Sequence, residues 1–303
     1  MRHIKRWRQH SGTIIDTVNA FDVIECDTCG FRHIVPIPSS DEIEQVYRED
    51  YYTVEKPRYL AEHHEDLEWW NAVYDERYDL LETWLPLPRR RLLDVGSGPG
   101  FFLLRGKQRG WETVGIEPST QAARHSRDLG LEIIQGFLDS TICETVGLFD
   151  VVHMHEVLEH LPDPRHILRL THRLLKPGGI VCIIVPNDYN SLQQVVRSQL
   201  HVVPWWIAPP HHINYFSHRS LQRLLESTGF QVVYTSSTFP IELFLLMGCN
   251  YIGNPVIGRE VHARRKAMEL HLVRAGYLAL KKKIYEVFAQ EGIGREVVVY
   301  AQV

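Results

Sequence analysis

A short glycine-rich stretch offers the clearest chemistry in the sequence. In "LLDVGSGPGFF", Asp94 stands two residues before Gly96, and Gly98 and Gly100 follow at alternate positions. Glycine lets the backbone turn tightly and approach a ligand closely. A loop of this kind between a strand and a helix, at the carboxyl end of a parallel sheet, commonly binds a ligand. We therefore expect a small-molecule site at residues 94–100.

The spacing of the glycines separates two kinds of ligand. A dinucleotide fingerprint, G-x-G-x-x-G/A, uses a small third residue to bring helix and strand together beside a pyrophosphate. Here Phe101 holds that position, and the third glycine comes one residue early. Asp94 is a poor neighbour for a pyrophosphate but a good one for a cation, because opposite charges attract most strongly where water is scarce. S-adenosylmethionine carries an ammonium, a sulfonium and no phosphate, so it fits this loop better.

A second carboxylate, Glu117, ends the strand-like run "VGIE", seventeen residues after Gly100. A carboxylate at this place can accept hydrogen bonds from both ribose hydroxyls. Nicotinamide and adenosylmethionine sites share this feature, so Glu117 indicates a nucleoside without choosing between them.

Several histidines could move protons. The aromatic loop "PWWIAPPHHINYFS" contains His211, His212 and Tyr215, which are our candidates for a general base. An aromatic cover packed on the sheet is the structural alternative for this loop. His153 and His155 lie on one face of the end of the run "FDVVHMH". Sites gather at the ends of sheet strands, so we expect His155 to contact cofactor or substrate, although a merely structural role stays open.

These residues need a parallel sheet to position them. From Leu92 onward, strand-like runs such as "RLLDVG", "WETVGIE" and "IVCIIVP" alternate with amphipathic helical runs. This alternation predicts an α/β domain, a mostly parallel sheet with helices on both faces, over residues 89–303. A helical insert is expected at about 241–290, before the final strand "REVVVYAQV". Residues 39–88 are predicted to form a helical connector or cap, with Ser40 as an N-cap and with one long helix ended by Pro86 and Pro88.

At this point the chain resembles the class I S-adenosylmethionine-dependent methyltransferases. The resemblance rests on "LLDVGSGPGFF", "VGIEPS", "FDVVHMHEVLEHLPDP", "LLKPGGIVCIIVPN" and "STGFQVV", which span residues 92–237 in the family's order and spacing. The last strand resembles the antiparallel strand that completes the family's sheet. The resemblance implies a Rossmann-like, seven-stranded methyltransferase sheet and methyl transfer from S-adenosyl-L-methionine.

The resemblance also implies roles for individual residues. The loop residues expected to bind the cofactor are Asp94, Gly96, Ser97, Gly98 and Gly100, with Asp94, Gly96 and Gly98 at its methionine portion. Glu117 would bind the ribose, and Phe137 would flank the adenine. His155 would lie where the methyl-bearing sulfur meets the acceptor.

Residues 1–38 contain half of a metal-binding motif. Cys26 and Cys29 are spaced C-x2-C, no second such pair follows, and zinc needs four ligands. The stretch "CDTCGFRHIVPIPSSDEIEQVYREDYY" is similar to the second half of an N-terminal zinc module found in many bacterial small-molecule methyltransferases, including its closing tyrosine pair, Tyr51 and Tyr52. His10 stands where the resemblance would place another thiolate. We therefore predict a structural Zn2+ site of His10, Cys26, Cys29 and His33 in a zinc-ribbon-like module; His3 is an alternative ligand, and a metal-free turn is the rival interpretation.

Composition limits the range of functions. The 303-residue chain is 44% hydrophobic and 23% charged, with a net charge of −4, so we expect a globular protein that does not act mainly on nucleic acid. Its longest apolar stretch is too short for a bilayer span. Five cysteines and the absence of an export signal favour a reducing cytoplasm. The sequence leaves the oligomeric state open.

The leading hypothesis is a cytoplasmic S-adenosylmethionine-dependent methyltransferase with a small-molecule acceptor, such as a nucleotide-linked sugar or another biosynthetic intermediate. Whether oxygen, nitrogen or carbon receives the methyl group stays open. One alternative is a nicotinamide-dependent oxidoreductase, which Phe101 and Asp94 disfavour. Another is an interaction protein that uses the zinc module and the basic N-terminus, with a non-catalytic Rossmann-like domain.

Overall fold

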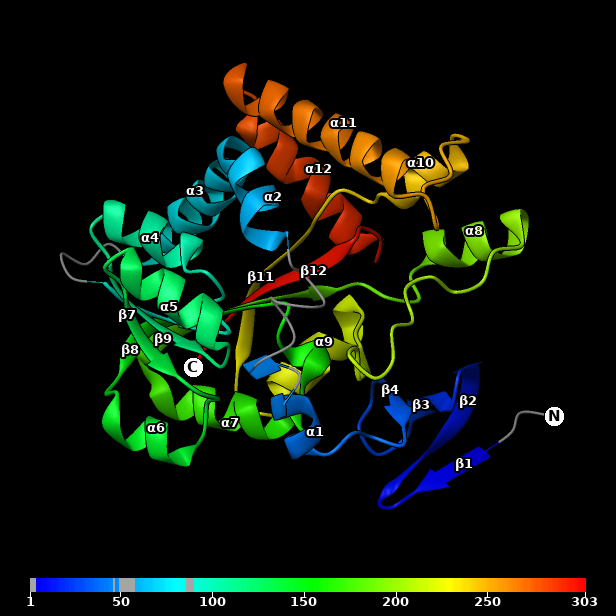
Figure 1. Cartoon of the computed structure of the whole chain (residues 1–303), viewed down its shortest axis with the longest axis horizontal. Helices are drawn as coiled ribbons and strands as arrows, with labels where there is room; N and C mark the ends of the chain where they lie inside the picture. Colours follow the sequence, from blue (N-terminus) through cyan, green and yellow to red (C-terminus); the bar gives the residue numbers. More distant parts are fainter. Residues whose placement is uncertain (1–3, 46, 49–57, 86–89) are drawn as a thin grey trace.

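The computed structural model describes residues 4–45, 47–48, 58–85 and 90–303, and its strands form two separate sheets (Figure 1). Several residues named in the sequence predictions lie outside the described ranges: His3, Tyr51, Tyr52, Pro86 and Pro88. The predicted boundary between residues 88 and 89 also lies outside them.

The larger sheet has seven strands in the order β11-β12-β9-β8-β5-β6-β7. Its strands are β5 (Arg91–Val95), β6 (Glu112–Glu117), β7 (Glu132–Gln135), β8 (Phe149–His155), β9 (Leu175–Pro186), β11 (Gln231–Ser237) and β12 (Glu296–Gln302). Neighbours from β7 to β9 pair in parallel, whereas β12 runs antiparallel to both β9 and β11. The expected seven-stranded, Rossmann-like sheet with an antiparallel closing strand is therefore confirmed.

Helices follow the parallel strands and cover both faces of the sheet. They are α4 (Phe101–Gln108), α5 (Thr120–Asp128), α6 (Ser140–Thr145), α7 (Pro164–Leu174) and α9 (His218–Glu226), with the short turn η2 (Leu158–His160) after β8. α8 (Ser191–Leu200) follows β9 and instead contacts α10 (Glu242–Leu246) and, through Arg197 and Asp16, β2 (His10–Val18). Because the central strands are buried on both faces, they consist of nearly continuous apolar residues; Leu92, Leu93, Val151 and Val152 are fully buried.

The smaller sheet has five strands in the order β1-β2-β3-β4-β10. β1 (Ile4–Trp7), β2 (His10–Val18), β3 (Phe21–Cys26) and β4 (Arg32–Val35) come from the N-terminal segment, whereas β10 (Asn214–Tyr215) lies within the predicted 89–303 domain. β10 pairs antiparallel with β4, and Ile34 N donates a hydrogen bond to Ile213 O. The N-terminal strands are therefore joined to the large domain by backbone hydrogen bonds.

The helical connector differs in detail from its prediction. α1 (Ser40–Gln45) is capped by Ser39 and not by Ser40: Ser39 Oγ accepts from Glu42 N at 3.3 Å, and Ser39 N donates to Glu42 Oε2 at 2.8 Å. This reciprocal capping box satisfies two backbone groups, which an N-cap one residue later would not. The long helix expected next is interrupted at Asp66, which separates α2 (Tyr59–Glu65) from α3 (Leu67–Trp84).

An insert between β11 and β12 carries α10 (Glu242–Leu246), α11 (Pro255–Arg274) and α12 (Leu278–Gln290). α11 and α12 lie beside α2 and α3 (Figure 1), and contacts between charged and aromatic side chains connect the two helix pairs. Lys281 forms ion pairs with Glu76 and Glu269, and Trp69 Nε1 donates to Glu269 Oε2 at 2.7 Å. Since Lys281 and Glu269 are both buried, each needs the other to offset its loss of hydration.

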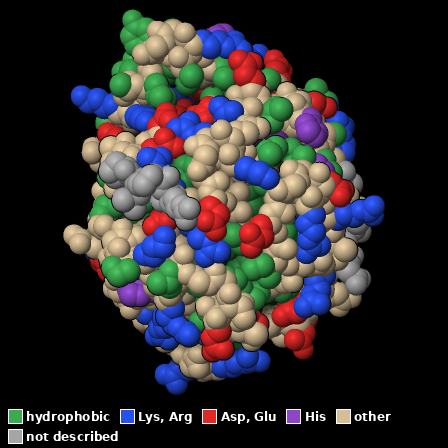
Figure 2. Space-filling model, turned by 90° about the vertical axis from the view of Figure 1, so that its left-hand side faces the viewer, with side chains coloured by type: hydrophobic (Ala, Val, Ile, Leu, Met, Phe, Trp, Pro, Cys, Tyr) green, Lys and Arg blue, Asp and Glu red, His purple; other side chains and the backbone are tan. Residues whose placement is uncertain are grey.

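Acidic and basic side chains are intermixed on the face that Figure 2 presents, which is the left-hand side of Figure 1. Among the described residues, no helix combines the length and the apolar character needed to cross a bilayer.

The contact between α3 and α4 gives a test of the packing. A Cβ added at Gly106 would overlap the Tyr78 Oη, which donates a hydrogen bond to Phe102 O at 3.0 Å. We expect Gly106→Ala to lower the free energy of unfolding by about 1–3 kcal/mol, because a buried, filled contact cannot accept another methyl group. Urea unfolding followed by circular dichroism measures this change.

Gly258 in α11 is the matched control, because a Cβ added there meets no atom within 4 Å. Gly258→Ala is expected to leave the free energy of unfolding unchanged or raise it by up to about 1 kcal/mol. Equal effects of the two substitutions would contradict the packing described here.

Candidate functional site

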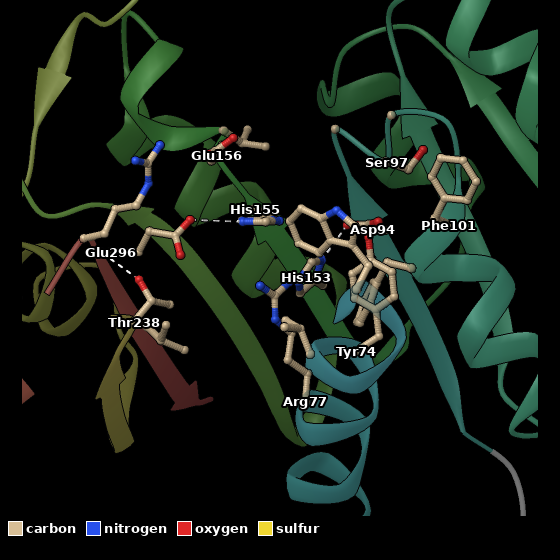
Figure 3. Close-up of a pocket in the computed structure, with 18 of the residues that line it drawn as sticks. Tyr74, Arg77, Asp94, Ser97, Phe101, His153, His155, Glu156, Thr238 and Glu296 are labelled. Atoms are coloured by element: carbon tan, nitrogen blue, oxygen red, sulfur yellow. Dashed lines mark hydrogen bonds and ion pairs between the residues drawn. The ribbon is translucent and has the colours of Figure 1, made fainter. Parts of the chain in front are cut away.

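A cavity of about 960 Å3 opens at the carboxyl ends of β5, β6 and β8. The glycine loop and Phe137 line one part of it, and residues of α2, α3, α11, α12 and β12 are among those that line the rest. Figure 3 shows Ser97, Phe101 and Asp94 toward one end, Glu296 and Thr238 toward the other, and His155 between them. The predicted loop residues Asp94, Gly96, Ser97 and Gly98 all border this cavity, while Gly100 lies at the start of α4 behind it.

Asp94 is held by a chain of two hydrogen bonds that begins on α3. His153 Nδ1 lies 2.7 Å from Asp94 Oδ1, and Arg77 Nη1 lies 3.2 Å from His153 Nε2. An arginine can only donate, so Nε2 accepts and Nδ1–H must donate to the carboxyl. Burial, followed by the charge of Arg77, holds the pKa of His153 well below its usual range, and a neutral imidazole is the form that this chain requires.

Glu117 is buried at the end of β6 and accepts two backbone hydrogen bonds. Gly98 N donates to Glu117 Oε2 at 2.7 Å, and Ser119 N donates to Oε1 at 2.8 Å. Burial raises the pKa of Glu117 to about 7 even though these donors oppose the shift, and burial also raises the pKa of Asp94 to about 7. Two carboxyls that lose hydration beside one cavity favour a ligand that brings positive charge or hydroxyl donors.

The backbone of the loop at residues 96–100 requires glycine at three positions. Gly96, Gly98 and Gly100 have φ values of +73°, +53° and +83°, a region that side chains rarely adopt. A Cβ at Gly96 would come within 2.7 Å of Val157 Cγ2, and one at Gly100 within 2.6 Å of Leu131 Cδ1. The loop is thus fixed between β8, α5 and the cavity.

Aromatic rings from α2 and α3 pack against this end of the cavity. His63 stacks on Phe101 with ring centroids 3.9 Å apart and on Trp70 with centroids 5.1 Å apart. Burial lowers the pKa of His63 to about 3, so its ring is neutral and acts as an aromatic surface. The connector helices therefore cover the glycine loop with a wall of stacked rings.

His155 borders the cavity and contacts a carboxylate of the last strand. It ends β8, lines the cavity, and its Nε2 lies 3.4 Å from Glu296 Oε1 at the start of β12 (Figure 3). Burial alone would raise the pKa of Glu296, but the contact with His155 and the charge of Arg295 hold it well below its usual range. The carboxylate is therefore ionised and orients the imidazole.

The three residues predicted from the aromatic loop lie one layer behind the cavity. His211, His212 and Tyr215 do not line it among the described residues; they pack behind His160, which does. His160 Nδ1 lies 2.8 Å from His211 O, and its ring centroid lies 4.9 Å from that of His212. Tyr215 is buried, and its hydroxyl donates to His212 O at 3.1 Å.

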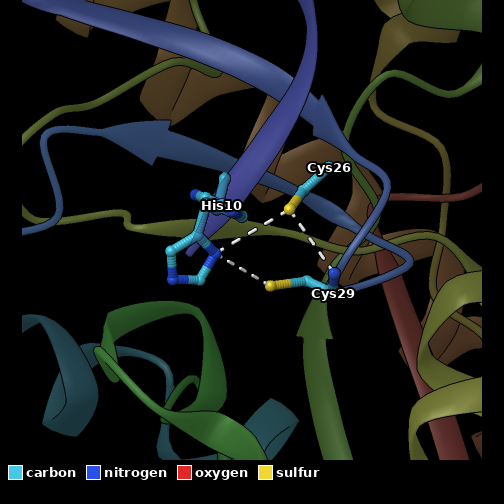
Figure 4. Close-up of side chains that lie close together, drawn as sticks. His10, Cys26 and Cys29 are labelled. Carbon is cyan, nitrogen blue, oxygen red and sulfur yellow. Dashed lines mark hydrogen bonds between the residues drawn. The ribbon is translucent and has the colours of Figure 1, made fainter. Parts of the chain in front are cut away.

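The four predicted metal ligands come together outside this cavity. One ligand atom from each of His10, Cys26, Cys29 and His33 lies within 4.8 Å of the others. Figure 4 shows His10, Cys26 and Cys29 pointing toward one another from β2, the end of β3 and the following turn; His10 Nδ1 is 3.3 Å from Cys29 Sγ and 3.8 Å from Cys26 Sγ. In the turn, Cys29 N donates to Cys26 Sγ at 3.4 Å, as in a tight metal-binding knuckle.

His33 is oriented for the same cluster. Its Nδ1 lies 2.9 Å from Ile34 O, so Nδ1 carries the proton and Nε2 is the lone-pair nitrogen. His33 is 1% exposed, and Nε2 has no hydrogen-bond partner among the described residues. An imidazole held through Nδ1–H to a carbonyl is the usual arrangement of a histidine zinc ligand. Burial, with a further contribution from Cys26, raises the pKa of the Cys29 thiol to about 12.

Comparison with known proteins identifies the family. A family model described as a methyltransferase domain matches residues 63–235, more than half of the 303-residue chain. The chain belongs to this methyltransferase family.

Curated relatives of this chain carry a more specific name. Ubiquinone biosynthesis O-methyltransferases from Caulobacter sp. (strain K31) and Ruegeria pomeroyi are 32% and 36% identical to it over 135 and 131 residues. The matched regions are 42% and 41% of this chain and 53% of each relative. The chain thus spans about half the length of the curated relatives it matches.

Solved structures include a SAM-dependent methyltransferase from Archaeoglobus fulgidus, which is 18% identical with a TM-score of 0.48. That comparison covers 76% of this chain and 94% of the other. The strand order of the chain, with its antiparallel β12, identifies the fold without this comparison.

Sequence reasoning missed two residues that line this cavity, Arg77 and Glu296. Arg77 lies mid-helix in α3, where a cation usually faces solvent, and only the docking of α3 brings it to His153. Glu296 begins the last strand, 141 residues after the His155 that it contacts. Its place at the start of a strand beside β9 is the one signal that could have suggested it.

Proposed function

We propose that the protein is an S-adenosylmethionine-dependent methyltransferase that acts on a small-molecule acceptor. The observation that carries the proposal is the pair of buried carboxyls, Asp94 and Glu117, at the ends of two adjacent parallel strands beside one cavity. Family membership supports it. The names of the relatives point to a hydroxyl acceptor as the first class to test.

The residues present fit this cofactor. When bound, it supplies a methyl group on a positively charged sulfur. Asp94 is proposed to bind its amino group and Glu117 its ribose hydroxyls, while Ser97 and the loop glycines approach the methionine portion and Phe137 flanks the adenine. The stacked wall of His63, Phe101 and Trp70 would exclude water from this end, which strengthens the attraction between opposite charges.

At the other end, His155 is the proposed general base. An acceptor hydroxyl loses its proton as its oxygen attacks, and a positioned imidazole can take that proton. Glu296 would hold the ring and stabilise the positive charge that it gains. His153 is unsuited to this role because both of its nitrogens are already engaged, Nδ1 with Asp94 and Nε2 with Arg77.

Cofactor affinity is expected to depend on pH. Because the pKa values of Asp94 and Glu117 lie near 7 in the protein without ligand, lowering the pH below that value neutralises both carboxyls and weakens binding. Isothermal titration with S-adenosylmethionine should show the affinity rising from pH about 6 to about 7.5, below the range in which an α-amino group itself loses its proton.

Asp94→Asn and Glu117→Gln should each weaken binding at pH about 7.5 by about tenfold or more and flatten this pH dependence, since a hydrogen bond to a charged group contributes about 1.5–3 kcal/mol. Glu132→Gln, at the exposed start of β7, is the matched control and should bind as the wild type does. No binding of S-adenosylmethionine or S-adenosylhomocysteine by folded protein would refute the proposed function.

The choice of base has a direct test. With catechol and related phenols as acceptors and radiolabelled S-adenosylmethionine as donor, His155→Ala should lower kcat about a hundredfold or more, as expected for loss of a general base. Its affinity for S-adenosylhomocysteine should change little. His211→Ala, His212→Ala and Tyr215→Phe are the comparison variants: if one of them abolishes turnover while His155→Ala retains it, the base comes from the aromatic loop as the sequence first suggested.

We also propose that His10, Cys26, Cys29 and His33 bind one structural Zn2+. The ligand types, their convergence and the unpaired Nε2 of His33 support this site. The ion would fasten β2, β3 and the knuckle to β4. It would serve the N-terminal sheet and not the reaction, because none of the four residues lines the cavity.

Elemental analysis of untagged protein should give about one zinc per chain, and a chelator should lower the Tm, because the binding free energy of such a site is also folding free energy. Cys29→Ser should lose the metal, whereas Cys143→Ser, at a half-buried thiol outside the cluster, should retain it. A zinc content below about one tenth of an equivalent in wild-type protein would exclude a structural zinc site.

A further inference from the structure

One face of α11 forms a charged wall of the cavity, on the side opposite the glycine loop. Arg259, His262 and Lys266 follow one another at three- and four-residue intervals, so they share one face of the helix, and all of them line the cavity. Arg295, the residue before β12, lines the same space. Burial lowers the pKa of His262 to about 3, so the positive charge of the wall comes from its arginines and its lysine.

Two of the cations on this wall, Arg259 and Arg295, form no ion pair among the described residues. Lys266 pairs with Asp66, and Lys281 pairs with Glu76 and Glu269. Arg259 and Arg295 have no carboxylate within 4.0 Å among the residues that the structure describes. Two guanidinium groups therefore border the cavity without a direct ion pair in the described part of the chain, although the charge of Arg295 also acts on Glu296.

A third arginine beside the cavity has a buried nitrogen without a hydrogen-bond acceptor in the described part of the chain. Arg265 is 7% exposed, and its Nε, 4.0 Å from Glu269 Oε1, has no hydrogen-bond partner in the described part of the chain. Its guanidinium lies over Trp69, 4.7 Å from the ring centroid. A buried donor without an acceptor costs free energy, and a ligand that supplies an acceptor would recover that cost.

Most of the carboxylates at this end are already engaged by other groups. Glu296 is engaged by His155, and Glu62 and Glu65 lie 3.9 and 3.7 Å from Arg58. Glu156, which is exposed at the end of β8, is the remaining acidic group near the proposed base. Most carboxylates at this end therefore already have a partner, whereas Arg259 and Arg295 form no ion pair among the described residues.

We propose that Arg259 and Arg295 bind an anionic group, a phosphate or a carboxylate, on the methyl acceptor. Guanidinium groups match both oxyanions because their N–H groups form a planar fork. Arg295 immediately precedes Glu296, the partner of His155, so the anion would lie near the atom that is methylated. The inference rests on the proposed function and extends it from a small molecule to an anionic one.

Titration calorimetry on the full chain saturated with S-adenosylhomocysteine tests the wall. The probes are pyrophosphate and benzoate, and the tighter of the two identifies whether the wall selects phosphate or carboxylate. We expect at least one probe to bind in the millimolar range or better. Arg259→Gln and Arg295→Gln should each weaken that binding about tenfold or more, since each removes a charged donor.

Arg264→Gln is the matched control. Arg264 is exposed on the same helix, as Arg259 is, but it lies outside the cavity lining and pairs with Glu260 at 2.6 Å, so probe binding should not change. Absence of binding by both probes, or equal affinities in wild type and both cavity variants, would overturn the anion site while leaving the methyltransferase proposal intact. Failure of S-adenosylhomocysteine itself to bind would instead refute the proposed function.

Discussion

The burial of the Asp94 carboxyl is the constraint on which the site depends. An ionisable group at the end of a central strand loses its hydration, and the protein compensates with a neutral imidazole and, behind it, a guanidinium. This chain of hydrogen bonds requires α3 to dock across the sheet so that Arg77 reaches His153. Phe102 of α4 stacks on His153 with ring centroids 4.0 Å apart, and Tyr78 of α3 stacks on Phe102 with centroids 4.6 Å apart. The connector helices are therefore part of the site and not merely a link to it.

Much of this could be predicted from the sequence because its signals are local. The apolar runs of the strands, the glycine loop and the C-x2-C turn each lie within a few consecutive residues, and the structure brings Asp94 and Glu117, and the four metal-ligand candidates, together as expected. The N-cap at Ser39 and the interruption at Asp66 were missed because equivalent serines stand side by side and because an amphipathic pattern continues across the break.

The rest depends on contacts between distant segments, which periodicity does not encode. The pairing of β4 with β10 joins residues more than 180 positions apart. It draws the aromatic loop behind His160 instead of into the cavity, and Ile213 N donates to Glu159 O at 2.7 Å to fix it there. A loop rich in histidine and tyrosine predicts proton transfer only when its partners are known. Here it connects the cysteine-bearing sheet to the turn that follows β8.

The position of the insert has a consequence for how such an enzyme can diversify. α10, α11 and α12 leave the sheet at β11 and return at the adjacent strand β12, so the wall opposite the glycine loop comes almost entirely from one uninterrupted stretch of chain. Recombination that replaces this stretch would exchange the whole wall in a single event. The strands that carry Asp94 and Glu117 would keep their sequence, so the proposed acceptor site could change over evolutionary time while the proposed cofactor site stayed the same.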